Sequence, residues 1–491
     1  MAHKTLVGGT AYNITGGKSM VSGTVYNINK GRSLVSGTGY NISLSSAQEP
    51  TAMLYSDYGM VFQLGDEVAQ NKTLWESFSG FEEADYTSFS VVPWNHRMSY
   101  IHNVSFQDNI SPISLSYWFY SSAIKNFHTA NLNLNSIINM RYTFYNCRDL
   151  ASSPICGDNV KDMYQAYNNC RNLTGSPACG NNVINMYKTY NSCYNLTGSP
   201  VCGSNVVNMA YAYNYCYNLT GSPVCGGSVT NMAYAYFRCY NLTGSPVCGD
   251  NVTNMAYAYE DCRKLTGSPA CGNNVTTMAY AYNNCTNLTG SPVCGNNVKN
   301  MSYTYHNCIN LTGSPVCGYN VTNMFQAYRN CSKLNGSPVC GDFVTDMNQA
   351  YANCHNLTGS PVCGNNVKNM ASAYEDCRKL TGAPVCGSKV TNMYYAYWNC
   401  RNLTGNAYFY SAVVSNAWYC FYNKNNSKRL NIYALSNSTT LSTLLLNNGT
   451  SSIVGGTITY TNAGTYYYNA VRNIYIYPVA DVAAARAANG D

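Results

Sequence analysis

Charged side chains are scarce in this 491-residue chain, where Asp, Glu, Lys and Arg make up only 10% of the residues, against about 25% in a typical globular protein. The net charge of +7 is spread thinly. No run of Lys or Arg provides the electrostatic footprint of nucleic-acid binding, so we expect no nucleic-acid partner. The surface must be built from Asn, Ser, Thr, Gly and Tyr, which suits polar, weakly charged ligands such as glycans.

Long apolar runs are also absent. No window approaches 18 apolar residues, so we expect no membrane span. The first nine residues, 1–9, contain no apolar stretch of signal-peptide length. If the protein reaches the outside of a cell, we therefore expect a route other than an ordinary secretory signal, such as the release of a particle by lysis.

Catalytic and metal-binding patterns are missing as well. The six histidines neither repeat nor pair at ligand spacing: His3, His96, His102, His128, His306 and His355. No Cys-x-x-Cys motif occurs, which argues against zinc ribbons and zinc fingers. No Ser/His/Asp or Cys/His set can be assembled. The sequence therefore predicts a protein that is not an enzyme and that needs no cofactor or metal.

What the chain does contain is a strict repeat. Twelve methionines, from Met140 to Met393, stand 23 residues apart. Cysteines (Cys147 to Cys400), leucines (Leu150 to Leu403) and an aromatic (Phe144, then Tyr167 to Tyr397) keep the same period. A fixed period of this length predicts a solenoid, in which each coil buries its apolar face only against its neighbours.

Within one coil, four apolar side chains fall at i, i+3, i+4 and i+7: Met255, Ala258, Tyr259 and Cys262. This spacing predicts one face of a helix about two turns long, which Thr253 or Asn254 would cap. A Gly-Ser-Pro turn and a short strand at 270–271 follow. We therefore expect short helix, turn, short strand and turn in each coil. Because strands stack more closely than helices, the stack should curve with its strands on the concave side.

The 24 cysteines alternate at spacings of 9 and 14 residues, in step with the repeat. We predict that the first column, Cys147 to Cys400, is a buried stack of thiols, because cysteine behaves as a small hydrophobe. The second column, Cys156 to Cys386, could point inward or outward. Neighbouring rungs lie about 5 Å apart, within bridging range, so rung-to-rung disulfides stay open. Cys420 belongs to neither column, and we expect it to behave differently.

Positions that vary between coils should face solvent. Tyr alternates with Gln, Lys and Ser two residues after each Met, and with Arg and Ser after each first-column Cys. This composition resembles that of binding surfaces. We therefore single out nine candidate ligand-binding residues: Tyr211, Tyr234, Tyr257, Tyr280, Tyr303, Tyr194, Tyr217, Tyr240 and Arg263. An ordinary solvated face with repeat-derived tyrosines is the alternative.

The sequence divides into four regions. Residues 1–45 hold three 14-residue units, each read as two short strands around a Gly-Thr turn, with only basic charges. Such units are too small to fold well alone, so we expect them to pack on a partner as an anchor. Residues 46–97 are predicted to be a small β-rich connector, 98–428 the solenoid with degenerate end coils, and 429–491 a mixed C-terminal cap.

The coil Val-Thr-Asn-Met-x-x-Ala-Tyr-x-x-Cys-x-x-Leu-Thr resembles the BspA-type leucine-rich repeat over residues 115–428. It departs from that pattern in having Tyr for Phe and Ser-Pro-Val-Cys-Gly in the strand, which leaves the strand register open. The resemblance implies an α/β solenoid, a curved leucine-rich-repeat-like stack, and the adhesion role of bacterial and protist surface proteins. The N-terminal Lys-Thr-Leu-Val-Gly-Gly-Thr-Ala-Tyr repeats resemble those opening virion proteins of gut bacteriophages.

Together these features predict a non-enzymatic adhesion or receptor-binding protein of a phage virion or tail fibre, located on the particle or on an extracellular surface. Its solenoid would bind a host surface glycan or protein, and residues 1–45 would contact other virion proteins. A structural or decoration protein of the particle is one alternative, and a bacterial cell-surface adhesin is another. The sequence leaves open whether copies associate into a homo-oligomer.

Overall fold

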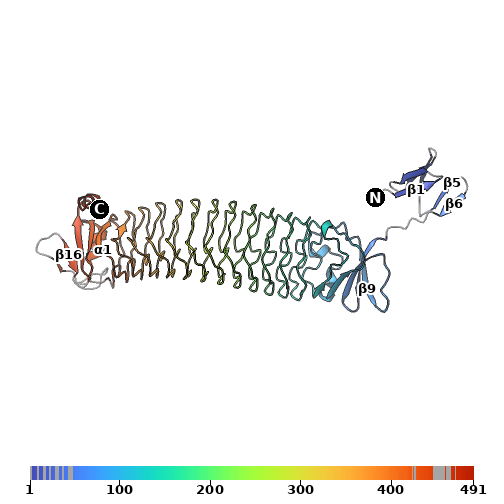
Figure 1. Ribbon diagram of the computed structural model, residues 1–491, viewed down its shortest axis with the longest axis horizontal. Helices are drawn as coiled ribbons and strands as arrows, with labels where there is room; N and C mark the ends of the chain where they lie inside the picture. The colour runs from blue at the N-terminus through green and yellow to red at the C-terminus, as the bar shows by residue number, and fades with distance from the viewer. Residues whose placement is uncertain are drawn as a thin grey trace.

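The structure of the protein is a computed structural model. It describes residues 48–422, 424, 427–445, 466–469 and 472–491, together with the strand backbones near the N-terminus and at 459–460. Figure 1 shows an elongated, gently bowed stack of coils with a small sheet at each end. Each coil bonds to the coil before it and the coil after it through parallel bridges one repeat apart, as at Asn231↔Asn254 and Asn254↔Thr277. The predicted solenoid is thus present.

Each of the three N-terminal units forms one antiparallel hairpin. The strands are β1 (His3–Val7), β2 (Thr10–Ile14), β3 (Lys18–Val21), β4 (Thr24–Asn27), β5 (Arg32–Val35) and β6 (Thr38–Asn41). The predicted Gly-Thr turns lie at positions outside or at the edge of the described residues. The role of these hairpins as an anchor stays a prediction.

A five-stranded sheet closes the N-terminal end of the stack, in the order β11-β10-β8-β7-β9. Its strands are β7 (Pro50–Tyr55), β8 (Gly59–Leu64), β9 (Leu74–Ser79), β10 (Asn103–Phe106) and β11 (Asn126–Phe127). Three short 3₁₀ helices, η1 (Phe89–Val91), η2 (Asn95–Tyr100) and η3 (Leu134–Ser136), lie beside it in the chain. β8 lies before residue 97 in the chain and β10 after it, and the two strands pair in this one sheet. The predicted domain boundary at residue 97 stays a prediction.

Aromatic packing joins this sheet to the first coils. The Phe62 ring stacks on Trp118 with centroids 5.1 Å apart, and Trp94 meets Trp118 edge-on at 5.3 Å. All three side chains are fully buried. The sheet therefore covers the apolar end of the first coil, as a cap on a solenoid must.

The predicted helix in each coil is wrong. Between residues 137 and 422 the described residues contain no α-helix or 3₁₀ helix. Instead, two tight turns follow each Met. In one coil, the Ala258 N–H donates to the Met255 carbonyl (3.0 Å), and the Cys262 N–H donates to the Tyr259 carbonyl (3.0 Å). Two such turns bring the same four apolar residues inward that a helix face would, so the spacing alone could not separate the two structures.

Left-handed residues explain why the helix does not form. The third residue of each turn, Tyr257 and Asp261, has φ of 60° and 61°, which is the feature that defines a type II turn. Two left-handed residues within seven interrupt a right-handed helix. The second of these positions is mostly Asn or Asp across the coils, and those residues tolerate this conformation.

Bonds between coils replace the bonds that a helix would make internally. The N–H groups of Met255, Tyr257 and Tyr259 donate to carbonyls of the next coil at 3.1, 2.9 and 2.9 Å. The residue expected to cap the helix has another role, since the Asn254 Oδ1 accepts from the Ala256 N–H (3.0 Å) as an Asx turn. The curvature was predicted from the different stacking distances of helices and strands. Because the coil holds no helix, that difference is absent, and the stack is only gently bowed (Figure 1).

The predicted strand is largely absent too, and the buried tyrosine column explains why. Tyr259 Oη donates to the Val247 carbonyl (2.6 Å) and accepts from the Val247 N–H (3.3 Å). Both groups that a strand ladder would need are thereby occupied. At the last full coil the arrangement reverses: Val385 bonds to the Pro361 carbonyl instead (3.1 Å), and the buried Tyr397 Oη has no partner among the described residues. The Tyr-for-Phe departure thus fixes this segment of each coil.

All 24 cysteines are free thiols, which settles the question that the spacing left open. The first column is fully buried, and each thiol donates to a carbonyl of the preceding coil, as Cys262 Sγ does to Tyr236 (3.0 Å). In the second column, nine of eleven thiols are half-buried. Cys156 Sγ, for example, accepts from the Gly180 N–H (3.1 Å). Cys420 is free and fully buried like the first column, so the expected difference is not seen in its exposure.

A six-stranded sheet closes the C-terminal end, in the order β12-β13-β14-β17-β16-β15. Its strands are β12 (Val385–Cys386), β13 (Gly405–Phe409), β14 (Leu430–Leu435), β15 (Thr459–Tyr460), β16 (Tyr467–Asn469) and β17 (Ile474–Val479). Two helices accompany it, α1 (Thr439–Leu445) and α2 (Val482–Ala488). β12 continues the line of coil strands, because Val362 bridges to Val385. In the described parts of the chain, no helix has the length and apolarity that a bilayer crossing needs.

Candidate binding surface

Five of the predicted residues form one continuous column of stacked rings. They are Tyr211, Tyr234, Tyr257, Tyr280 and Tyr303, and we call this column the tyrosine ladder. Successive ring centroids lie 4.5, 4.4, 4.5 and 4.3 Å apart, with ring planes within 14° of parallel. All five residues have φ between 55° and 60° and are half-buried at the surface. The ladder therefore crosses five coils on the outer side of the turns.

The residue before each ladder tyrosine is small. It is Ala before the first four ladder tyrosines and Ser302 before the last, whereas the coils on either side carry Tyr187 and Phe325 there, followed by Lys and Gln. The correlation does not extend along the whole column, because Tyr394 precedes Tyr395 and Ala371 precedes Ser372. Tyr187 meets the first ring edge-on at 5.9 Å, and Phe325 meets the last at 5.2 Å. Within the ladder a small residue leaves room for each ring to stack, and at both ends a large aromatic residue lies against the terminal ring.

Stacking determines what the ladder can offer a ligand. Each inner ring has both faces against its neighbours, so ring edges and phenol groups, rather than open faces, meet the solvent. Burial, reinforced by the neighbouring rings, raises the pKa of Tyr234 and of Tyr280 to about 12. These phenols stay neutral at physiological pH. The ladder thus presents a file of hydroxyl groups that can donate and accept hydrogen bonds.

The other predicted residues form a second column, after the first-column cysteines. Tyr194, Tyr217 and Tyr240 stack at 5.0 and 5.2 Å. Arg171 lies over the first ring at 5.4 Å, and the exposed Arg263 lies over the last at 5.0 Å, which closes both ends by cation–π contacts. The predicted strip is thus two columns rather than one.

Two residues that the sequence reading missed join the columns. Phe237 lies 5.5 Å from Tyr234 and 5.3 Å from Tyr215, and Tyr215 meets Tyr217 at 6.0 Å. Both residues belong to the second turn of their coils. The prediction of a helix did not include this turn, so it did not place these residues at the surface. They connect the ladder to the second column as one aromatic surface.

A polar file runs beside the ladder. Asn283 donates from Nδ2 to Glu260 Oε1 (2.9 Å), and its Oδ1 lies 2.8 Å from His306 Nδ1. Burial raises the pKa of Glu260 to about 7, and burial together with Arg329 lowers the pKa of His306 to about 4. The His306 ring meets Tyr303 edge-on at 5.5 Å. This file adds directional polar groups to the aromatic surface.

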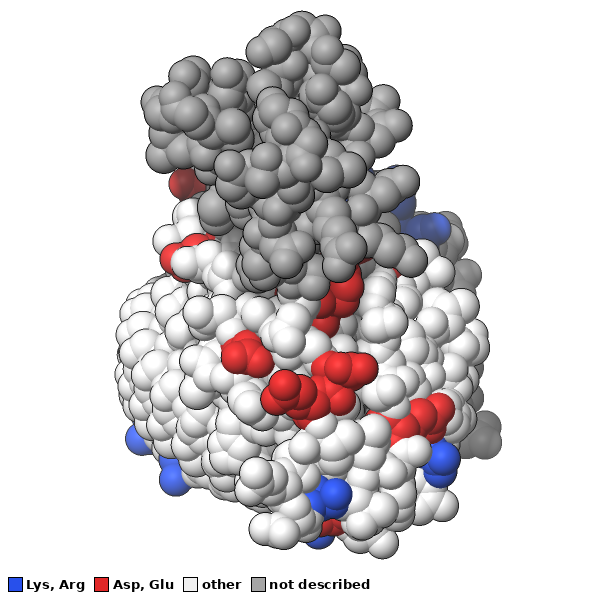
Figure 2. Space-filling model, turned by 90° about the vertical axis from the view of Figure 1, so that its right-hand side faces the viewer, with Lys and Arg blue, Asp and Glu red and all other residues white. Residues whose placement is uncertain are grey.

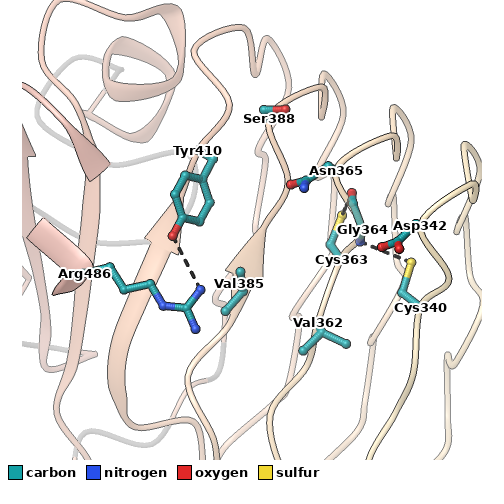
Figure 3. A pocket seen from close by; sticks show the side chains of 10 residues that line it. All are labelled: Cys340, Asp342, Val362, Cys363, Gly364, Asn365, Val385, Ser388, Tyr410 and Arg486. Carbon is teal, nitrogen blue, oxygen red and sulfur yellow. Dashed lines mark hydrogen bonds between the residues drawn. The ribbon is translucent and has the colours of Figure 1, made fainter. Parts of the chain in front are cut away.

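Neither of two hollows among the described residues assembles a catalytic centre. The larger, of about 570 Å³, lies between the last coils and α2. In Figure 3 the Arg486 and Tyr410 side chains lie together on one side of it (Nη1 to Oη 3.5 Å), and Cys340 and Cys363 line the other side. Burial raises the pKa of Cys363 to about 12 and also raises that of Cys340. Neither thiol is therefore an activated nucleophile.

A second hollow, of about 410 Å³, lies at the N-terminal end and is lined by Asp85, Tyr117, Arg141 and Asp162. Arg141 pairs with Asp162 (3.2 Å), and Asp85 Oδ1 accepts from Ser114 Oγ (2.7 Å). Its carboxylates are thus engaged within the protein. Among the described residues, no three His, Cys, Asp or Glu side chains are placed to hold a metal ion.

Comparisons with known proteins agree with the repeat reading. The family described as "Mycoplasma protein of unknown function, DUF285" matches residues 253–360 and 322–434, which supports BspA-type repeats over this part of the chain. No curated protein matches. The crystal structure of a leucine-rich cell surface protein from Faecalibacterium prausnitzii A2-165 aligns at a TM-score of 0.31 and 14% identity, over 74% of this chain and 93% of that one. At that TM-score the likeness carries no argument. Neither match bears on the phage resemblance of the N-terminal repeats.

Proposed function

We propose that this protein is a non-enzymatic recognition protein whose solenoid binds an extended glycan, or a glycan-bearing surface protein, along its axis. The tyrosine ladder is the observation that carries this proposal. Its five phenol groups form one regular file, and the second column and the polar file lie beside it. A polymer lying along the stack could contact several coils at once, so weak contacts would add up.

The fold itself does not require the ladder. The same column is Gln165, Gln326 and Ser372 in other coils, and all three have φ between 52° and 54°. A left-handed backbone costs about 1–2 kcal/mol for a residue with a side chain, and the ladder places a bulky ring there five times in succession. Tyr supplies large, rigid and amphipathic contact area at a small cost in side-chain entropy. We infer that these coils are specialised for contact.

The finer proposal places the protein on the outside of a phage particle, as a virion or tail-fibre component. The basic hairpins of residues 1–45 would attach it to other virion proteins, and the solenoid would face the host. Display on a bacterial surface and a purely structural role on the particle are the competing proposals. The binding test that follows separates recognition from a structural role, because only recognition needs the ladder.

The test replaces four ladder residues, Tyr211, Tyr234, Tyr257 and Tyr280, with Gln. Gln is a residue that other coils carry in this column. The matched control replaces Tyr142 and Tyr395, which lie in the same column outside the ladder. Labelled full-length protein is then titrated onto intact bacteria of the source community. We expect the ladder variant to bind at least tenfold more weakly (about 1.4 kcal/mol) and the control to bind normally. Equal binding by all three proteins would leave a structural role as the better account.

A further inference from the structure

Basic residues that are scattered in the sequence lie in one column on the solenoid. Five arginines each follow a first-column cysteine, and all are exposed: Arg148, Arg171, Arg263, Arg378 and Arg401. We call these residues the arginine column. The 23-residue repeat places their side chains on the same corner of the coils. Arg148 and Arg171 lie in successive coils, as do Arg378 and Arg401, and Arg263 lies between the two pairs. The thin net charge of the sequence therefore conceals a line of guanidinium groups along one corner of the solenoid.

The same contact orients every member of this column. In each case the residue two positions earlier, an Asn or Asp at positive φ, accepts from the arginine Nε. The distances are 2.9 Å for Arg148, 2.9 Å for Arg171, 3.4 Å for Arg263, 2.8 Å for Arg378 and 2.8 Å for Arg401. Neighbouring clamps are connected, since Asn169 Nδ2 donates to Asn146 Oδ1 (2.6 Å). The guanidinium groups are thus held in place before any ligand arrives.

The members of the column differ in how free they are. Arg263 and Arg378 also pair through Nη2 with Asp261 (3.2 Å) and Asp376 (2.8 Å). Arg148, Arg171 and Arg401 are held by the amide oxygens of asparagines, and no acceptor contacts their terminal amino groups within the described residues. The two terminal amino groups of each guanidinium are therefore available for a carboxylate or phosphate, the groups that guanidinium recognises through paired hydrogen bonds.

The surroundings add more positive charge. The adjacent column holds three exposed lysines, at 264, 333 and 379, against one carboxylate, Asp149. The second tyrosine column fills the gap between Arg171 and Arg263, about 20 Å long at roughly 5 Å per coil. By contrast, residues 48–110 hold nine acidic and two basic residues, and Figure 2 shows acidic side chains gathered on that end of the rod. Positive charge therefore follows the side of the solenoid.

We infer that the arginine column binds a linear anionic polysaccharide, one that carries carboxylate or phosphate groups along its chain. This inference rests on the proposed function and names the class of glycan that the solenoid would take. The anionic groups would meet the arginines, and the sugar hydroxyls between them would meet the edges of Tyr194, Tyr217 and Tyr240. The column extends along the stack, as a polymer does.

A nucleic acid fits this surface less well. Single strands bind by stacking bases on open aromatic faces, and here the ring faces are covered by neighbouring rings and by Arg171 and Arg263. Duplex DNA carries one charge per about 1.7 Å of its axis, a far denser array than eight cations spread over twelve coils. A polysaccharide with anionic groups at intervals suits the spacing better.

The test compares two full-length variants that lose the same charge. The first replaces Arg148, Arg171 and Arg401 with Thr, the residue found at position 286 of that column. The control replaces Lys161, Lys299 and Lys368 with Thr, which occupies their own column in most other coils. Dissociation constants are measured for polygalacturonate, poly(glycerol phosphate), neutral dextran and a 20-nucleotide DNA strand, in about 50 and about 200 mM NaCl, where charge-driven binding should weaken by at least tenfold.

We expect wild type and control to bind polygalacturonate, poly(glycerol phosphate) or both, and the arginine variant to bind at least tenfold more weakly. The polymer preferred identifies carboxylate or phosphate as the recognised group. Equal losses in both variants, equal binding of dextran, or tighter binding of DNA would each overturn the inference. Cell binding of the same variants separates this result from the proposed function. If ladder substitution abolishes cell binding while arginine substitution leaves it intact, recognition stands and the polyanion inference fails.

Discussion

Two tyrosine columns run through the same coils and use the same residue for different ends. Tyr259 lies in the buried column, where ring centroids of successive coils are 5.3–5.6 Å apart. Tyr257, two residues earlier, lies in the ladder at the surface. The buried phenol bonds to the backbone of its own coil, whereas the ladder tyrosines are only half-buried. The comparison shows that different positions of one repeat determine the folding of the coil and the properties of its surface.

The largest effect should come from raising the pH, which acts on the buried columns. Burial raises the pKa of Cys147 to about 12, and raises those of the other first-column thiols too. Thiols in the folded protein keep their protons at pH values above 9, where thiols of the unfolded chain lose them. The contribution of these thiols to the free energy of unfolding is therefore full below pH 9 and falls as the pH rises. Each thiol that stays protonated in the folded state contributes a slope of up to about 1.4 kcal/mol per pH unit, so the column as a whole should make the free energy of unfolding fall steeply. Thermal melts from pH 7 to 11 would show it.

A melting temperature that stays level from pH 9 to 10.5 would contradict this account of the thiols. The same samples allow a thiol count. Few groups should react in the native protein, and nearly all 24 should react after denaturation without reductant.

An intermediate effect should come from removing single phenol groups. Tyr259→Phe leaves the N–H and carbonyl of Val247 without their partner, which should reduce the free energy of unfolding by about 1–3 kcal/mol. Tyr257→Phe removes the hydroxyl of a half-buried ladder residue in the same coil and should change stability by less than about 0.5 kcal/mol. Urea unfolding of the two variants measures the difference. Equal losses would show that both columns serve the fold.

The smallest effect should come from the polar file. Burial raises the pKa of Glu260 to about 7 in the folded protein, above its ordinary value. Its contribution to stability is therefore full at low pH and is lost as the pH rises through 7. Glu260→Gln, which cannot ionise, should reduce the fall in melting temperature between pH 5 and pH 8. The absence of any difference between variant and wild type would place this carboxyl in a more solvated setting.

The sequence predicted the solenoid, its buried columns and the surface position of the candidate tyrosines, because period and composition report directly on burial. It did not predict the turns. Met255, Ala258, Tyr259 and Cys262 have the spacing of a helix face, and the contrary signal was the recurring Asn or Asp at the place of Asp261. That same misreading hid Phe237 and Tyr215, which join the two surface columns.

Features that depend on several coils were the hardest to predict. No single repeat shows that Arg148, Arg171 and Arg401 share a corner or that one kind of asparagine contact holds them. Likewise, the missing strands follow from a bond between Tyr259 and Val247 that no propensity describes. Such properties arise from stacking, and the sequence of one coil does not contain them.

The most direct test of the central claim measures stability and binding on one protein, the variant with Gln at positions 211, 234, 257 and 280. The account predicts a melting temperature within about 3 °C of wild type, because Gln already occupies this column at 165, 326 and 349 with the same backbone conformation, together with at least a tenfold loss of cell binding. A large fall in melting temperature, with binding that merely follows the folded fraction, would contradict the account and make the ladder a structural element.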